Sequence, residues 1–117
     1  FYTFLQEVFF KTRDSRYCVW LEGGEYVSAL RLEPYRDGLL LEALETAPEQ
    51  RRKGYGHRLM QATLAQIQGK PVYSHVGKRN VASLALHKGC GFEKIQAFAV
   101  YIDGSVSQNA VTLKRIG

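Results

Sequence analysis

The order of apolar patterns and turn residues along this chain predicts an α+β (mixed α/β) fold on a mostly antiparallel sheet. Three observations lead to this prediction. Three strand-like segments separated by turns occupy much of the first half, a helical segment follows them, and later strands surround a second helical segment. An antiparallel meander followed by a strand–helix–strand unit places one parallel strand pair in an otherwise antiparallel sheet.

The first part of the chain is expected to form one helix and the meander. Apolar residues recur at helical spacing at Phe1, Phe4, Leu5 and Val8, which predicts an amphipathic helix over residues 1–10. Strands are predicted at 17–22, 26–32 and 39–46, with turns at 23–24 and 34–38. The glycine pair at 23–24 is typical of a tight hairpin, so these strands are expected to pair as neighbours.

The second part is expected to alternate helices with strands. A helix over residues 54–68 is predicted, and its buried side is expected at Leu59, Met60, Thr63, Leu64 and Ile67. Gly69 and Pro71 are expected to end this helix. Asn80 is predicted to cap a short helix that ends near residue 88. The remaining strands are predicted at 72–76, 93–102 and 111–116.

The composition fits a single domain over residues 1–117, because 45% of the residues are apolar and no repeat or linker divides the chain. No apolar run approaches the roughly 18 residues that a membrane span needs. The first ten residues lack the basic leader of a secretory signal. Cys18 and Cys90 lie far apart in the sequence and are expected to be reduced thiols. We therefore expect a cytoplasmic protein with no membrane partner.

The basic surplus points to a ligand that carries phosphates. The formal net charge is +5, and basic residues gather over 51–58 and 78–88, beside glycine-containing turns. A compact ligand with several phosphates suits this clustering better than a long duplex. Nucleic-acid binding ranks last among the functions considered, because no nucleic-acid motif and no interleaved basic–aromatic strand pattern is present.

Residues 51–56, with the sequence Arg-Arg-Lys-Gly-Tyr-Gly, form the clearest phosphate-binding pattern. They lie between a predicted strand and a predicted helix. The glycines allow a sharp turn that gathers several N–H groups, and the helix that follows adds unpaired donors and the positive end of its dipole. This arrangement predicts a pyrophosphate site. The P-loop and dinucleotide-binding patterns are both absent.

Two motifs resemble signatures of the GNAT acetyltransferase family. Residues 51–56 are similar to its coenzyme A motif, R/Q-x-x-G-x-G/A. The second motif, N-x-x-A/S-x-x-x-Y-x-x-x-G-F, is matched by Asn80, Ser83, His87, Gly91 and Phe92, with His87 in place of tyrosine. The resemblance covers about residues 39–102. It implies the GNAT-type acyl-CoA N-acyltransferase fold with a splayed parallel pair, here 39–46 and 72–76, without the family's first strand and one helix.

The resemblance also implies acetyl-coenzyme A as cofactor and a place for it. Backbone N–H groups of Arg52 through His57 would hold the pyrophosphate. The cofactor-binding residues at this turn would be Arg51, Arg52, Lys53, Gly54, Tyr55, Gly56 and His57. The exposed strand from Leu44 to Thr46 would pair with the pantetheine arm. Asn80 would hydrogen-bond this arm, and Ser83 and His87 share its helix face.

Two side chains are candidates for proton transfer. Glu42 lies on the strand beside the cofactor, at a level where family bases often occur, and alternation predicts that it shares a face with Leu44 and Thr46. His87 replaces the family tyrosine that donates to the leaving thiolate. The alternatives are a structural ion pair for Glu42 and a contact role for His87. His75 is interpreted as a strand surface residue, and no spacing indicates a metal site.

Two functional hypotheses lead. The first is an N-acetyltransferase in which a primary amine, on a small molecule or a peptide, attacks acetyl-coenzyme A directly in a ternary complex. The second is a catalytically weak coenzyme A-binding module. The family's acceptor wall varies widely, so the acceptor stays open. With only one helix expected before the meander, this wall is reduced, lies outside this sequence or is completed by a second subunit, and a homodimer stays open.

Overall fold

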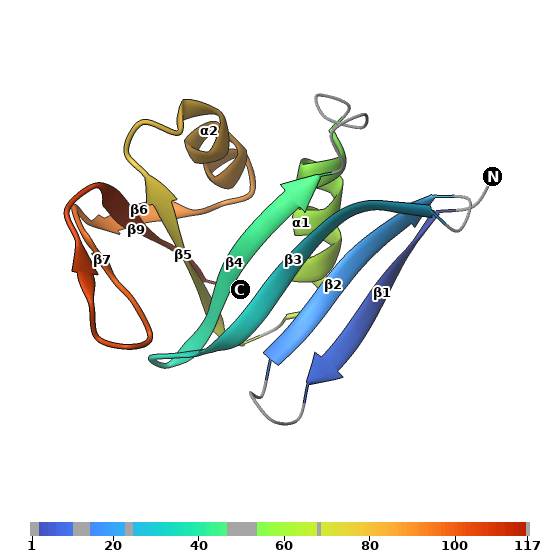
Figure 1. Ribbon diagram of the computed structural model, residues 1–117, viewed down its shortest axis with the longest axis horizontal. Helices are drawn as coiled ribbons and strands as arrows, with labels where there is room; N and C mark the ends of the chain where they lie inside the picture. The colour runs from blue at the N-terminus through green and yellow to red at the C-terminus, as the bar shows by residue number, and fades with distance from the viewer. Residues whose placement is uncertain (1–2, 11–14, 23–24, 47–53, 68, 117) are drawn as a thin grey trace.

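The computed structural model describes residues 3–10, 15–22, 25–46, 54–67 and 69–116 (Figure 1). The meander strands are β1 (Thr3–Phe10), β2 (Ser15–Glu22), β3 (Glu25–Tyr35) and β4 (Gly38–Thr46). The later elements are α1 (Tyr55–Ala65), β5 (Pro71–Gly77), α2 (Val81–Gly89), β6 (Glu93–Gln96), β7 (Ala99–Val100), β8 (Val106–Ser107) and β9 (Ala110–Ile116). The predicted mixed α+β architecture is confirmed.

The main sheet has the strand order β1-β2-β3-β4-β5-β9-β6, and β7 and β8 form a separate small hairpin. All neighbours in the main sheet are antiparallel except β4 and β5. Helix α1 makes the connection between these two strands and packs against β2, β3 and β4, while α2 follows β5 on the other side of the opening between β4 and β5 (Figure 1).

The predicted helix over residues 1–10 is wrong, because this segment contains β1. Its backbone pairs with β2 along the whole strand, from Thr3 opposite Glu22 to Phe10 opposite Ser15. The segment is rich in phenylalanine and also holds threonine and valine, residues that favour strands. Edge pairing with β2 therefore prevails over the helical spacing of a few apolar residues, and the meander has four strands.

The predicted strand over residues 93–102 is also wrong in its length. Its first part is β6, whose pairing with β9 becomes irregular between Lys94 and Gln96. Its last part is β7, which leaves the main sheet and pairs with β8. The other predicted strands and both predicted helices after residue 54 are present within a few residues of the expected ends.

The core lies between the sheet and α1. The five residues predicted for the buried side of the first long helix are all buried, namely Leu59, Met60, Thr63, Leu64 and Ile67. The four apolar ones pack against β-strand residues that include Leu30, Leu41 and Val72. Each large aliphatic side chain removed from water stabilises the fold by about 1.5–3 kcal/mol before the entropy of ordering is counted. No helix within the described ranges is both long and apolar enough to cross a membrane.

Strands β4 and β5 pair only at their beginnings. The parallel pairs join Leu39–Leu41 to Val72–Ser74, after which β4 continues to Thr46 and β5 to Gly77 without further pairing between them. Strand β5 instead remains paired with β9 up to Gly77. The predicted splayed pair is therefore present, and its opening begins at Glu42 and His75.

A β-bulge in β4 changes which side chains share a face. Ala29 lies opposite Glu45 and Arg31 opposite Glu42, so two steps along β3 match three along β4. Leu44 consequently packs against the same core as Leu41, on the α1 side. The expectation that Glu42 and Leu44 share a face is wrong, because simple alternation does not hold across a bulge.

Candidate functional site

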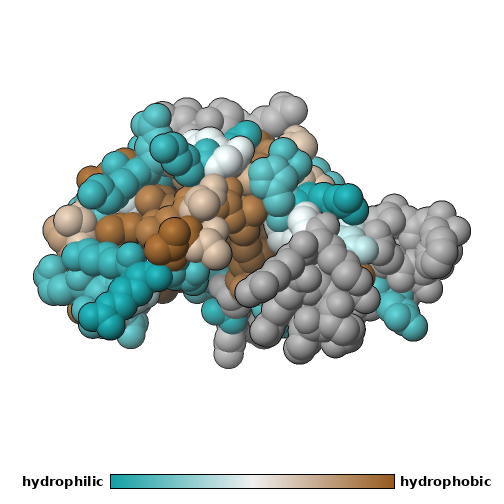
Figure 2. Space-filling view, turned by 90° about the horizontal axis from the view of Figure 1, so that it is seen from above, coloured by the Kyte–Doolittle hydropathy of each residue, from teal (hydrophilic) through white to brown (hydrophobic). Residues whose placement is uncertain are grey.

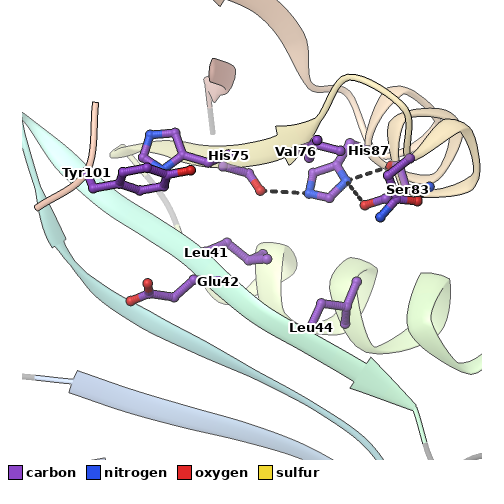
Figure 3. A pocket seen from close by; sticks show the side chains of 11 residues that line it. Leu41, Glu42, Leu44, His75, Val76, Ser83, His87 and Tyr101 are labelled. Carbon is purple, nitrogen blue, oxygen red and sulfur yellow. Dashed lines mark hydrogen bonds between the residues drawn. The ribbon is translucent and has the colours of Figure 1, made fainter. Parts of the chain in front are cut away.

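A groove with a volume of about 300 Å³ lies where β4 and β5 separate. It is lined by Leu41, Glu42, Leu44, Ser74, His75, Val76, Gly77, Asn80, Ser83, His87 and Tyr101. Figure 3 shows that Glu42, His75 and Tyr101 gather at one end and that Ser83 and His87 lie at the other. The opening of the sheet therefore brings together predicted residues from β4 and α2, at two distinct ends.

Glu42 is held by an ion pair at the first end. Arg31 Nε on β3 donates to Glu42 Oε1 at 3.3 Å and lies 3.5 Å from a carboxylate oxygen of Glu33. Burial raises the pKa of Glu42 above its ordinary value, and the Arg31 guanidinium opposes this rise only in part. Arg31 therefore pairs with two carboxylates, those of Glu33 and Glu42. Because Arg31 is shared, Glu42 remains an acidic group beside the groove.

His75 lies across the opening from Glu42 in an aromatic cluster. Its ring makes edge contacts with Tyr35 and Tyr101, with centroid distances of 5.5 and 5.0 Å. Its Nε2 lies 3.3 Å from the Tyr35 hydroxyl oxygen. Burial, and then the positive charge of Arg36, lowers the pKa of His75. The ring is therefore neutral at physiological pH and is not a plain surface residue.

His87 occupies the second end and is buried, with 2% of its surface exposed. Its Nδ1 lies 2.7 Å from the Ser83 carbonyl oxygen, which can only accept, so Nδ1 carries a proton. Its Nε2 lies 2.8 Å from Ser74 Oγ. Burial lowers the pKa of His87 and favours the neutral ring, in which Nε2 accepts from Ser74. Both ring nitrogens therefore have partners within the protein.

The predicted N-cap and the predicted helix face are present in α2. Asn80 Oδ1 accepts a hydrogen bond from the Ser83 backbone N–H at 3.1 Å, as expected for an N-cap. Within the described ranges the Asn80 amide nitrogen makes no hydrogen bond, so it remains a donor at the rim of the groove.

The first turn of α1 lies next to the end of β4 and to α2. Gly54 adopts φ 81° at the N-cap and has no side-chain cap, so the first helical N–H groups lack the usual side-chain acceptor. A Cβ at Gly56 would lie 3.7 Å from Thr46 Oγ1 and 3.8 Å from a Leu86 methyl group. The predicted Arg51, Arg52 and Lys53 lie outside the described residues.

The side chain of His57 is directed toward α2. Its Nδ1 lies 3.7 Å from Cys90 Sγ, at the C-terminal end of α2. Only its backbone N–H can therefore serve the predicted role of holding the pyrophosphate.

Seen from above relative to the view of Figure 1, the described surface shows an apolar strip bordered by polar side chains (Figure 2). Within the described ranges, no cluster of His, Cys, Asp or Glu suits a metal ion.

Two polar residues of the groove, Ser74 and His75, were not singled out from the sequence as part of a site. They lie in a short strand with no local motif. Their roles depend on partners that lie far away in the sequence: Ser74 on His87, and His75 on Tyr35. The only available signal was the pattern of polar residues within an otherwise apolar strand.

The comparisons with known proteins agree with this geometry. Residues 1–92 match the family described as "Acetyltransferase (GNAT) family". No curated protein sequence gives a significant match. Among solved structures, IAA acetyltransferase from Bacillus cereus ATCC 14579 superposes with a TM-score of 0.76 at 15% identity, over 97% of this chain and 99% of that one.

Two further solved structures are similar. A Bacillus subtilis acetyltransferase in complex with CoA gives a TM-score of 0.74 at 16% identity, over 92% of this chain and 79% of that one. The ribosomal-protein-S18-alanine N-acetyltransferase from Escherichia coli gives 0.68 at 18% identity, over 85% and 66%. At identities of 15–18%, these likenesses show the fold alone.

Proposed function

The chain belongs to the GNAT family of acetyltransferases, and from this membership we propose that it transfers an acetyl group from acetyl-coenzyme A to a primary amine. The observation that carries the proposal is the opening between β4 and β5, where a free strand edge meets a groove lined by one carboxylate and two imidazoles. The bound CoA of the Bacillus subtilis neighbour and the alanine acceptor of the Escherichia coli neighbour support it.

The described residues fit the shape and chemistry of coenzyme A. Beyond Leu41, the β4 edge that faces β5 has no partner strand in the described part of the chain, so its backbone can pair with the pantetheine arm. The uncapped start of α1 offers N–H donors for a pyrophosphate, and Gly56 leaves no side chain in the way. The Asn80 amide would donate to the arm from α2. Acetyl-coenzyme A supplies an activated thioester at this opening.

The acceptor amine is assigned to the end of the groove that holds Glu42. A primary amine is mostly protonated at neutral pH, and the carboxylate attracts the ammonium form. The ion pair with Arg31 favours this electrostatic role of Glu42 over removal of a proton. The groove is lined by buried and half-buried side chains from β4 and β5, and it suits a small molecule or the extended end of a peptide.

The amine attacks the thioester directly in a ternary complex. Cys18 and Cys90 are both buried, and neither lines the groove, so no thiol there is available to form an acetyl-enzyme. Direct transfer requires both substrates to bind before reaction. Initial rates measured against both substrates are therefore expected to give intersecting lines, whereas parallel lines would indicate a covalent intermediate.

His87 has two candidate roles. The sequence-based hypothesis assigns it the proton for the leaving thiolate. The hydrogen bonds of both ring nitrogens favour the alternative, in which His87 fixes Ser74 and the wall of the groove. In this alternative, His87 holds the Ser74 hydroxyl in place at the end of the groove that also contains Ser83, where the cofactor arm is proposed to bind.

The test combines binding with turnover. Acetyl-coenzyme A at 100 times its Kd should stabilise the protein by about 2.7 kcal/mol, measured as a rise in Tm. Release of free thiol should then be followed with a panel of polyamines, amino acids, aminoglycosides and peptide N-termini. Binding with turnover supports the proposal. Absence of a Tm shift at millimolar cofactor contradicts it.

A coenzyme A-binding module with little catalysis is the second candidate. The observation that favours it is the histidine at the family's tyrosine position, with its ring nitrogens already bonded within the protein. It predicts a clear Tm shift with acetyl-coenzyme A together with no thiol release from any amine. The same pair of measurements therefore separates the two candidates.

A further inference from the structure

We propose that His75 is a catalytic residue that accepts the proton of the acceptor amine at Nδ1, with Tyr35 as the positioning residue that fixes its tautomer. This inference rests on the proposed acetyl transfer. Glu42 and His75 are the first residues of β4 and β5 beyond the last parallel pair, Leu41 and Ser74. They therefore flank the point at which the sheet opens (Figure 3).

The tautomer of His75 follows from the hydrogen bonds of Tyr35. The Tyr35 hydroxyl has one proton, which it donates to the carbonyl oxygen of Val100. Because that carbonyl can only accept, the hydroxyl oxygen is left as an acceptor for His75 Nε2, 3.3 Å away. His75 Nε2 therefore carries the proton, and Nδ1 carries the lone pair. In the described part of the chain no hydrogen bond engages Nδ1.

His87 has the opposite arrangement, which separates the roles of the two imidazoles. In His87 the proton is on Nδ1 and faces a helix carbonyl, and the lone pair on Nε2 is occupied by Ser74. In His75 the lone pair remains available, and the ring lines the groove in contact with Tyr101 and across the opening from Glu42. Of the two rings, only His75 has a nitrogen ready to take a proton.

The surroundings of His75 keep it neutral when the amine arrives. Arg36 follows β3, and its guanidinium lies 5.1 Å from the centre of the Tyr35 ring. Its charge, added to burial, lowers the pKa of His75. Among the described residues, the groove and the ring contacts place Glu42 on β4 and the hydroxyls of Tyr35 and Tyr101 near His75 as further titratable groups, and β9 places the uncharged Thr112 opposite it.

The proton balance of the step is simple. The acceptor ammonium, held beside Glu42, gives one proton to His75 Nδ1. The freed nitrogen lone pair forms the N–C bond to the acetyl carbon, the C–S bond breaks, and the amide nitrogen loses its second proton as the thiolate becomes a thiol. His75 then releases its proton to solvent. The sum is ammonium plus acetyl thioester giving amide, thiol and one free proton.

The test uses His75→Gln, whose amide can still donate to Tyr35 but has no basic nitrogen. Its maximal rate at neutral pH is expected to fall about 10²-fold or more, the usual size of a general-base contribution. The loss should shrink as the pH rises and the amine deprotonates unaided. The Kd for acetyl-coenzyme A, measured by calorimetry, should stay unchanged. His75→Asn serves as a second variant if the glutamine variant melts early.

Tyr35→Phe and Tyr73→Phe form a matched pair. Both tyrosines are buried and contact each other edge to face, but Tyr73 donates to Asp37 and not to His75. Tyr35→Phe should lower the maximal rate and alter the acid side of the pH–rate profile, with unchanged cofactor affinity. Tyr73→Phe should leave the profile as in the parent. An equal effect of the two would overturn the positioning role of Tyr35.

The outcomes separate this inference from the function on which it rests. Failure of the parent protein to turn over any amine overturns both. An active parent with an equally active His75→Gln variant overturns the role of His75 alone and leaves acetyl transfer standing. Nitrogen NMR of the free protein gives a readout without substrate: a neutral Nε2–H ring is expected for His75 above pH 7, and an Nδ1–H ring would overturn the assignment.

Discussion

The hydrogen bond between Ser74 and His87 is expected to stabilise the fold as well as shape the groove. It joins β5 to α2, and the exposed fractions of the two residues are 3% and 2%. Ser74→Ala leaves the lone pair of Nε2 without a donor, and His87→Phe leaves the Ser74 hydroxyl without its partner. Each single change should therefore destabilise the protein, whereas the double change removes both groups together.

The expected magnitude follows from burial. A buried polar group that loses its partner costs about 1–3 kcal/mol, and replacing both partners by apolar groups can be nearly neutral. We expect about 2 kcal/mol for each single variant. The double variant should be destabilised by less than the sum, with an interaction energy within the range of about 0.5–3 kcal/mol that contacting pairs show.

The assay is urea unfolding of the parent, both single variants and the double variant at a pH where His87 is neutral. His87→Phe combined with Ser105→Ala provides the control, because Ser105 bonds Asp103 in an exposed loop and shares no partner with His87. That pair should be additive within about 0.5 kcal/mol. Additive energies for Ser74→Ala and His87→Phe would show that the buried hydrogen bond does not exist.

Three further predictions concern the cofactor, the acceptor and the pH. Gly56→Glu should abolish acetyl-coenzyme A binding in calorimetry but leave a folded protein, because the new Cβ has ordinary contacts at 3.7 Å and its carboxylate would repel a pyrophosphate. Unchanged affinity would contradict a pyrophosphate site at the start of α1. Glu42→Gln should raise the KM for the amine more than it lowers kcat, since the carboxylate attracts the ammonium; a loss confined to kcat would instead make Glu42 the base. Burial lowers the pKa of His87 and His75 in the folded protein, so the unfolded chain binds more protons below about pH 6.5. The free energy of unfolding should therefore fall as the pH drops from about 6.5 toward the lower pKa values of the folded state. A urea midpoint that does not change across this window in the parent, with His87→Phe measured alongside, would refute this pH dependence.

Elements whose ends are marked by glycine, proline or a capping residue could be predicted from the sequence. Gly69 and Pro71 mark the end of α1 and the start of β5, and Asn80 caps α2 through its own side chain. These signals act over a few residues, where local chemistry decides the backbone. The splayed strand pair was expected from the family resemblance and is present, whereas the phosphate-binding turn stays a prediction.

Features that depend on distant partners were not predictable. β1 forms because β2 supplies its hydrogen bonds, although the apolar spacing of the segment fits a helix. The bulge in β4 opposite Ala29 and Arg31 changes the face of the sheet on which the Leu44 side chain lies. No residue type within β4 predicts this bulge. The different tautomers of His75 and His87 are set by Tyr35 and Ser83, and only the folded chain brings His75 and Tyr35 together.

The central claim is that this chain acetylates an amine at the opening between β4 and β5. The most direct measurement is thiol release from acetyl-coenzyme A with a panel of amines, with mass spectrometry of each amine. The account predicts at least one acetylated amine, formed in equal amount to the thiol, and loss of this product in Gly56→Glu. Binding of acetyl-coenzyme A without any acetylated amine, or no binding at all, would contradict it.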